Sequence, residues 1–126
     1  MEIKVAKNAG FCFGVKRAIE LVNKLSSEGK PVYTYGDIIH NESVVKELEE
    51  KGVRVVNDLD ELKNLEKGTL VIRSHGIPKS DYDKLADLGA EFQDATCPFV
   101  KKIHKLAREY SCLLYTSDAA DATLCR

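Results

Sequence analysis

Four short stretches of the sequence carry residue types that could do chemistry. They are G-F-C-F-G with Cys12, I-I-H-N with His40, S-H-G with Ser74 and His75, and A-T-C-P with Cys97. Thiolates are nucleophiles and ligands of soft metals, whereas histidine rings and glycine-containing loops can bind phosphate oxygens. The residue types therefore indicate thiol or metal chemistry beside an anion site.

The surroundings of the two cysteines favour a chemical role. Gly10 and Gly14 flank Cys12 and permit close backbone approach, and a predicted helix begins directly behind it. Cys97 precedes Pro98, which suits the first turn of a helix. Because a helix N-terminus favours the thiolate form of a cysteine, both thiols are candidate ligands or nucleophiles. A small buried core residue is the alternative for each cysteine.

The histidines differ in how strongly their context suggests binding. His75 lies directly after the apolar run T-L-V-I-R and before a glycine, which predicts a loop with exposed N–H groups suited to a phosphate. His40 could instead be only the N-terminal flank of a helix. His104 falls inside the last predicted helix, where we expect a surface position away from the other candidates.

Several chemistries compete for Cys12. G-x-C-x-G has the form of a nucleophile elbow, which would make the chain a thiol hydrolase, but such an elbow normally follows several strands. A Cys-x5-Arg phosphatase loop needs one residue more than Cys12 to Arg17 provides, and no C-x-x-C pair indicates zinc. Two widely separated cysteines fit an iron–sulfur cluster with a further ligand from elsewhere. A phosphate-binding module without a cluster also remains open.

The elements that must position these residues alternate between strand and helix patterns. Apolar runs predict strands over residues 3–6, 32–35, 53–56, 69–73 and 91–94. Helical spacing predicts helices over 15–25, 42–51, 79–88 and 99–110, with a helical turn over 60–65. This order predicts an α/β fold, a mainly parallel sheet with helices on both faces. Ligands of such sheets bind outside the carboxyl ends of the strands, which is where the four stretches fall.

Composition limits the classes of function. The chain has 126 residues, of which 44% are apolar and 31% charged, with a formal net charge of −1. That balance suits one globular domain, and no overall positive field favours nucleic acid. No apolar run is long enough for a membrane span, and the N-terminus lacks an apolar signal core, so we expect a cytoplasmic protein with reduced thiols.

The four stretches in their order resemble the LytB family of 4-hydroxy-3-methylbut-2-enyl diphosphate reductases, from residue 1 to about residue 110. The resemblance implies an oxidoreductase of the non-mevalonate isoprenoid pathway. It reductively dehydroxylates its small-molecule diphosphate substrate to isopentenyl and dimethylallyl diphosphate, with electrons from a donor such as ferredoxin or flavodoxin.

The resemblance also implies site residues. It places three α/β units around a [4Fe-4S] cluster, and Cys12 and Cys97 match two of the three cysteine ligands. His40 and His75 match histidines that hold the diphosphate, with Ser74 beside them as a substrate-binding residue. No catalytic residue is assigned, because the family's proton-relay glutamate, third cysteine and third histidine have no match here.

The end of the sequence departs from the rest. Residues 111–126 contain no lysine or glutamate and are similar to a translated sequencing adapter, so we expect a foreign tail in which Cys112 and Cys125 have no role. We therefore expect residues 1–110 to form the first α/β unit plus the entry to the second. On this interpretation the chain is an N-terminal fragment that is inactive alone.

Overall fold

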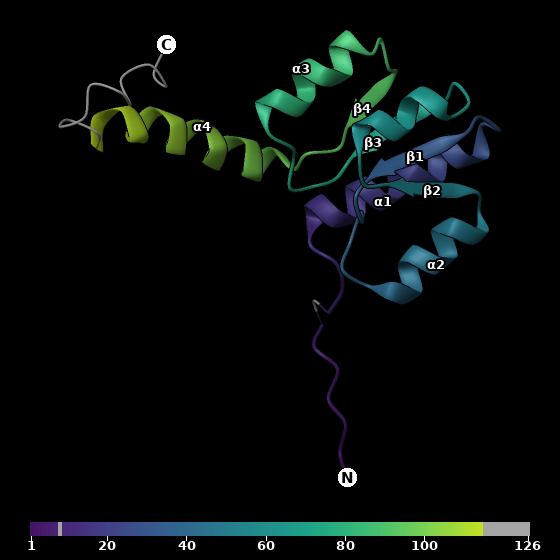
Figure 1. The fold of residues 1–126 in the computed structure, drawn as a ribbon. Helices are drawn as coiled ribbons and strands as arrows, with labels where there is room; N and C mark the ends of the chain where they lie inside the picture. The colour runs from purple at the N-terminus through teal and green to yellow at the C-terminus, as the bar shows by residue number, and fades with distance from the viewer. Residues whose placement is uncertain (8, 115–126) are drawn as a thin grey trace.

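The computed structural model describes residues 1–7 and 9–114, which form a four-stranded sheet flanked by helices (Figure 1). The strands are β1 (Val32–Tyr35), β2 (Val53–Val56), β3 (Thr69–Ile72) and β4 (Phe92–Asp94). The helices are α1 (Phe13–Ser27), α2 (Glu42–Glu50), the short 3-10 helix η1 (Leu59–Asn64), α3 (Lys79–Asp87) and α4 (Pro98–Leu114). The predicted α/β fold is confirmed.

All strand pairs are parallel, and the order across the sheet is β2-β1-β3-β4. Val32 of β1 pairs with Val53 on one side and with Thr69 on the other, so the strands end nearly level. After β2 the chain crosses to the opposite side of β1 to form β3. This change of direction makes the carboxyl ends of β1 and β3 the switch point at which α/β sheets bind ligands.

Helices cover both faces of the sheet, as the apolar pattern predicts. Val71 of β3 faces the cluster packed by α1 and α2, whereas Leu70 and Ile72 face the cluster packed by η1 and α3. These side chains are almost fully buried, and each contributes about 1.5–3 kcal/mol of transfer free energy. The two cores hold the sheet rigid beneath the loops at its carboxyl edge.

The segment before α1 is not a strand, so the prediction for residues 3–6 is wrong. Residues 1–7 are exposed and carry no regular structure, with Ile3 at 78% and Val5 at 80% exposure. A strand needs a hydrogen-bonded neighbour, and in the described ranges this segment pairs with neither edge of the sheet. Cys12 is consequently positioned by α1 rather than by a preceding strand.

Helix α4 also exceeds its predicted bounds. It begins at Pro98 and runs to Leu114, so the first residues of the expected foreign tail are helical. The rest of that tail, residues 115–126, lies outside the described residues.

Helix α4 extends away from the sheet (Figure 1). Phe99, Ile103, Leu106 and Tyr110 recur at helical spacing and form an apolar stripe that is exposed, with Phe99 at 67% and Ile103 at 62%. Lysines occupy other positions of the helix. Among the described residues, no helix combines the length and apolar character needed to cross a membrane.

We predict that the chain associates at high concentration, because an isolated helix with an uncovered apolar stripe gains free energy by burying it. Ile103→Lys should lower the average mass in sedimentation measurements, whereas Lys102→Ala, beside the stripe, should not. A chain that stays monomeric at millimolar concentration would contradict this expectation.

Candidate functional site

Three loops meet at the carboxyl edge of the sheet. They follow β1, β3 and β4 and span residues 36–41, 73–78 and 95–97. Because β3 is hydrogen-bonded to both β1 and β4, the three loops start side by side. This edge is where sequence analysis places the candidate site.

The loop after β4 stays hydrogen-bonded to the loop after β3. The Ala95 N–H donates to the Ile72 carbonyl at 3.1 Å, and the Cys97 N–H donates to the Ser74 carbonyl at 2.9 Å. The parallel pairing therefore continues past both strands. As a result Cys97, which is only 8% exposed, lies directly beside the S-H-G loop.

The first turn of α1 packs against Cys97. A β-carbon built on Gly14 would lie 2.7 Å from the Cys97 Cβ and 2.8 Å from its Sγ, so only glycine fits there. Three residues further along, the Arg17 Nη1 donates to the Thr96 carbonyl at 3.3 Å. These contacts join the N-terminus of α1 to the loop that carries Cys97.

Cys12 is the residue that precedes α1, and its thiol is free. Its carbonyl accepts the first helical hydrogen bond from the Lys16 N–H at 3.0 Å, while its side chain is exposed and makes no capping bond. Cys97 precedes α4 in the same way, since its carbonyl accepts from the Lys101 N–H at 2.9 Å. Each thiol therefore lies at the positive end of a helix dipole.

His40 and His75 come from adjacent loops and stack on each other. Their ring centroids are 6.3 Å apart with an angle of 22° between the planes, and both side chains are exposed. The Gly76 N–H donates to the Arg73 carbonyl at 3.0 Å, so this expected phosphate donor is already engaged. The two exposed imidazole rings are the side chains at this point that remain available to an anion.

Ser74 directly precedes His75 in the chain and is almost completely buried, at 3% exposure. Its Oγ has no hydrogen-bond partner, and neither has the buried Nε of Arg73. Buried polar atoms without partners are rare in proteins and mark places where a ligand or water completes the bonding. Two adjacent residues at the switch point thus retain unused hydrogen-bonding capacity.

The aspartate at the end of β4 organises the same loop. The Asp94 carboxylate accepts hydrogen bonds from both the N–H and the Oγ1 of Thr96, and it pairs with the Lys101 Nζ at 2.6 Å. Burial alone would raise the pKa of Asp94, but the bonds from Lys101 and Thr96 outweigh it and hold the pKa below its usual value. The carboxylate is therefore ionised at neutral pH.

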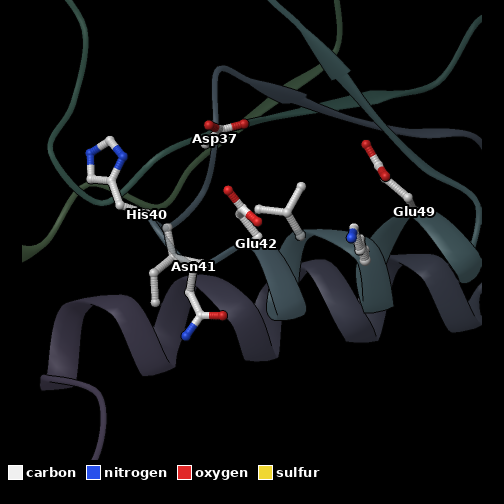
Figure 2. A pocket seen from close by; sticks show the side chains of 8 residues that line it. Asp37, His40, Asn41, Glu42 and Glu49 are labelled. Atoms are coloured by element: carbon white, nitrogen blue, oxygen red, sulfur yellow. The ribbon is translucent and has the colours of Figure 1, made fainter.

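Two cavities in the structure are lined by residues other than the cysteines. One cavity of about 420 Å³ lies along α2, with His40 and Asn41 at one end and Asp37, Glu42 and Glu49 among its walls (Figure 2). Its acidic lining disfavours a phosphate ligand. A second cavity of about 660 Å³ is lined by residues around the opposite ends of the strands, including Lys30 and Gly68.

His104 lies closer to the candidate site than sequence analysis predicts. It is a surface residue of α4, as expected, but its Cε1 is 3.6 Å from the position that a Gly76 β-carbon would occupy. The expectation that it lies away from the other candidates is wrong. The direction of the α4 axis after Cys97 decides where His104 lies. The spacing of apolar residues predicts the helix but not the direction of its axis.

The metal-binding capacity of this region can be read from its donor atoms. Within residues 1–7 and 9–114, no three or more histidine, cysteine, aspartate or glutamate side chains are grouped to hold a metal ion. The region instead offers two free thiols: Cys97, whose side chain packs against Gly14, and Cys12, which precedes Gly14 by two residues in the chain. Thiolates are the ligands that iron–sulfur clusters use, so this donor set fits two positions of a cluster and no complete site.

Comparison with known proteins agrees with the motifs. The family model described as LytB protein matches residues 3–117. The 4-hydroxy-3-methylbut-2-enyl diphosphate reductases of Caldanaerobacter subterraneus subsp. tengcongensis and Clostridioides difficile are 55% and 46% identical to the chain, over 87% of its length. The chain spans 39% of the length of these relatives.

Solved structures show the same fold. The Plasmodium falciparum E-1-hydroxy-2-methyl-but-2-enyl-4-diphosphate reductase superposes with a TM-score of 0.76 at 32% identity, over 83% of this chain and 33% of that one. A structure of (E)-4-hydroxy-3-methyl-but-2-enyl diphosphate reductase gives a TM-score of 0.71 at 40% identity, over 86% of this chain and 38% of that one. The ordered motifs, the parallel sheet and these matches together show that the chain belongs to the LytB family.

Proposed function

We propose that this chain carries part of the active site of a 4-hydroxy-3-methylbut-2-enyl diphosphate reductase. Cys12 and Cys97 supply two thiolate ligands of a [4Fe-4S] cluster, and His40 and His75, with Ser74 next to His75 in the chain, bind the diphosphate of the substrate. Such a cluster, when bound, supplies electrons and a Lewis-acidic iron for removal of the substrate hydroxyl. A third thiolate must come from outside the described residues.

The contact between Gly14 and Cys97 supports this proposal most directly. It brings the helix that begins after Cys12 against the side chain of Cys97, although the two cysteines are separated by most of the chain. A structural role for Cys97 alone requires no such approach. The free thiols and their places before two helices are suited to binding soft metal as thiolates.

The histidines support the substrate part of the proposal. Two exposed, nearly parallel rings at the switch point offer N–H groups to phosphate oxygens that lie between adjacent loops. The unpartnered Ser74 Oγ, from the residue before His75, adds a hydroxyl. The diphosphate would orient the other end of the substrate toward the cysteines. An electron donor such as ferredoxin or flavodoxin would complete the reaction.

Removing either thiol should prevent cluster uptake. Anaerobic incubation of the full chain with iron and sulfide should produce the broad visible absorption of thiolate–iron charge transfer. Cys12→Ser and Cys97→Ser should each abolish it, because each variant removes one of the two thiolate ligands that we assign to the cluster. The double variant Cys112→Ser/Cys125→Ser serves as the control and should keep the absorption. Equal absorption in all variants would contradict the assignment.

Gly14→Ala tests the helix contact. A methyl group at this position must displace Cys97, so we expect a loss of about 1–3 kcal/mol in the free energy of unfolding, as for overpacked cores. Urea denaturation measures this loss. Lys16→Ala, in the same turn but exposed, is the control. Unchanged or increased stability of Gly14→Ala would show that the contact imposes no constraint.

His75→Ala should weaken the binding of inorganic pyrophosphate by about tenfold, because a hydrogen bond to a charged oxygen is lost. His40→Ala should act similarly, whereas unfolding should change little because both rings are exposed. Isothermal titration calorimetry gives the affinity, and Lys67→Ala, at the opposite edge of the sheet, controls for the removal of an exposed side chain. Pyrophosphate affinity that is insensitive to both histidines would refute their assigned role.

A further inference from the structure

The loop 95–97 lies at the edge of the sheet, where backbone groups lack a neighbouring strand. The N–H groups of Ala95 and Cys97 point toward β3 and are bonded there. Thr96 lies between them, so its N–H and carbonyl point to the opposite side, beyond the last strand of the described sheet. Thr96 is nevertheless buried, at 3% exposure, and its backbone therefore needs partners.

Asp94 and Arg17 supply those partners. The Asp94 Oδ1 accepts from the Thr96 N–H at 2.9 Å and also from the Thr96 hydroxyl, which forms a turn closed by the aspartate side chain. The Thr96 carbonyl accepts from Arg17. Both outward-facing groups of Thr96 are thus satisfied, and the chain can stay extended up to Cys97 without a further strand.

The second oxygen of Asp94 reaches the helix that follows. Its Oδ2 pairs with the Lys101 Nζ at 2.6 Å, and Lys101 also donates its N–H to the Cys97 carbonyl. The same carboxylate therefore holds the residue before Cys97 and the first turn after it. Side chains that restrain a ligand from both sides fix its rotamer and lower the cost of binding a metal.

We propose that Asp94 is a positioning residue for Cys97. It closes the turn at Thr96 and secures the start of α4, and it thereby keeps the Cys97 thiol directed at Gly14 and the rim of the sheet. The role of that thiol as a cluster ligand rests on the proposed function, whereas the restraint on its position does not depend on a cluster. Asp94 touches neither substrate nor cluster in this assignment.

The alkylation rate of Cys97 tests the restraint without any cluster. Because Cys97 is buried, a maleimide should label it slowly in the reduced full chain, whereas exposed Cys12 should react fast. Peptide mapping by mass spectrometry separates these thiols from Cys112 and Cys125. Asp94→Ala should raise the Cys97 rate by at least about tenfold, since hydrogen bonds to a charged group are lost, and leave the Cys12 rate unchanged.

Two further variants separate positioning from general destabilisation. Asp94→Asn retains an oxygen acceptor for the Thr96 N–H, so it should restore most of the protection of Cys97. Asp58→Ala removes a comparable side-chain acceptor at the start of η1, remote from Cys97, and should not change the Cys97 rate. The proposal is overturned if Asp94→Ala leaves the rate unchanged, or if Asp58→Ala raises it equally.

Iron and sulfide incubation gives the second readout. If the wild-type chain takes up a cluster, Asp94→Ala should reduce the visible absorption per chain, and Asp94→Asn should recover it. If the wild-type chain takes up none, the proposed function fails while the alkylation rates still decide the role of Asp94. A cluster bound equally well by Asp94→Ala would count against positioning.

Discussion

The site depends on hydrogen bonding that continues beyond the sheet. Past the end of β4, the chain remains paired with the residues after β3 up to the bond between the Cys97 N–H and the Ser74 carbonyl. This extension turns two separate loops into one rigid strip. Without it, Cys97 would be a residue of a free loop, and neither the S-H-G loop nor α1 would have a fixed surface to pack against.

The contact of Gly14 with Cys97 joins the first turn of α1 to this strip of paired backbone. A helix N-terminus can approach a neighbouring backbone this closely only where the side chain is a hydrogen atom. The positive ends of α1 and α4 are then close together at one rim. That arrangement gives a chain of net charge −1 a local field suited to thiolates and phosphates, with Arg17 adding a further positive charge.

The rim differs from the body of the sheet in how its polar groups are used. In the body, apolar side chains alternate between two packed faces, and the backbone N–H and carbonyl groups of neighbouring strands hydrogen-bond to one another. At the rim, Ser74 and Arg73 keep buried atoms without partners, and both histidines are exposed. Polar atoms without hydrogen-bond partners are expected at a binding surface on a rigid sheet, because a bound ligand supplies the missing partners.

Much of the fold was predictable from local pattern. Alternating apolar runs indicated the four strands of the sheet, and helical spacing indicated α2, whose first N–H groups, of Ser43 and Val44, donate to the Asn41 side chain at 3.1 and 3.2 Å. The motifs also indicated the family. The strand expected over residues 3–6 failed because an apolar run becomes a strand only with a paired neighbour.

The sequence by itself determined that His40, His75 and Cys97 stand at the carboxyl edge of the sheet, because each lies in a loop that follows directly on a strand. It did not determine the place of Cys12, which no strand precedes in the part of the chain that the structure describes. Only the tertiary structure decided that His40 stacks on His75, that His104 lies beside Gly76, and that Gly14 touches Cys97. These are contacts between segments far apart in the chain. They follow from strand order and helix direction, which short-range spacing does not encode.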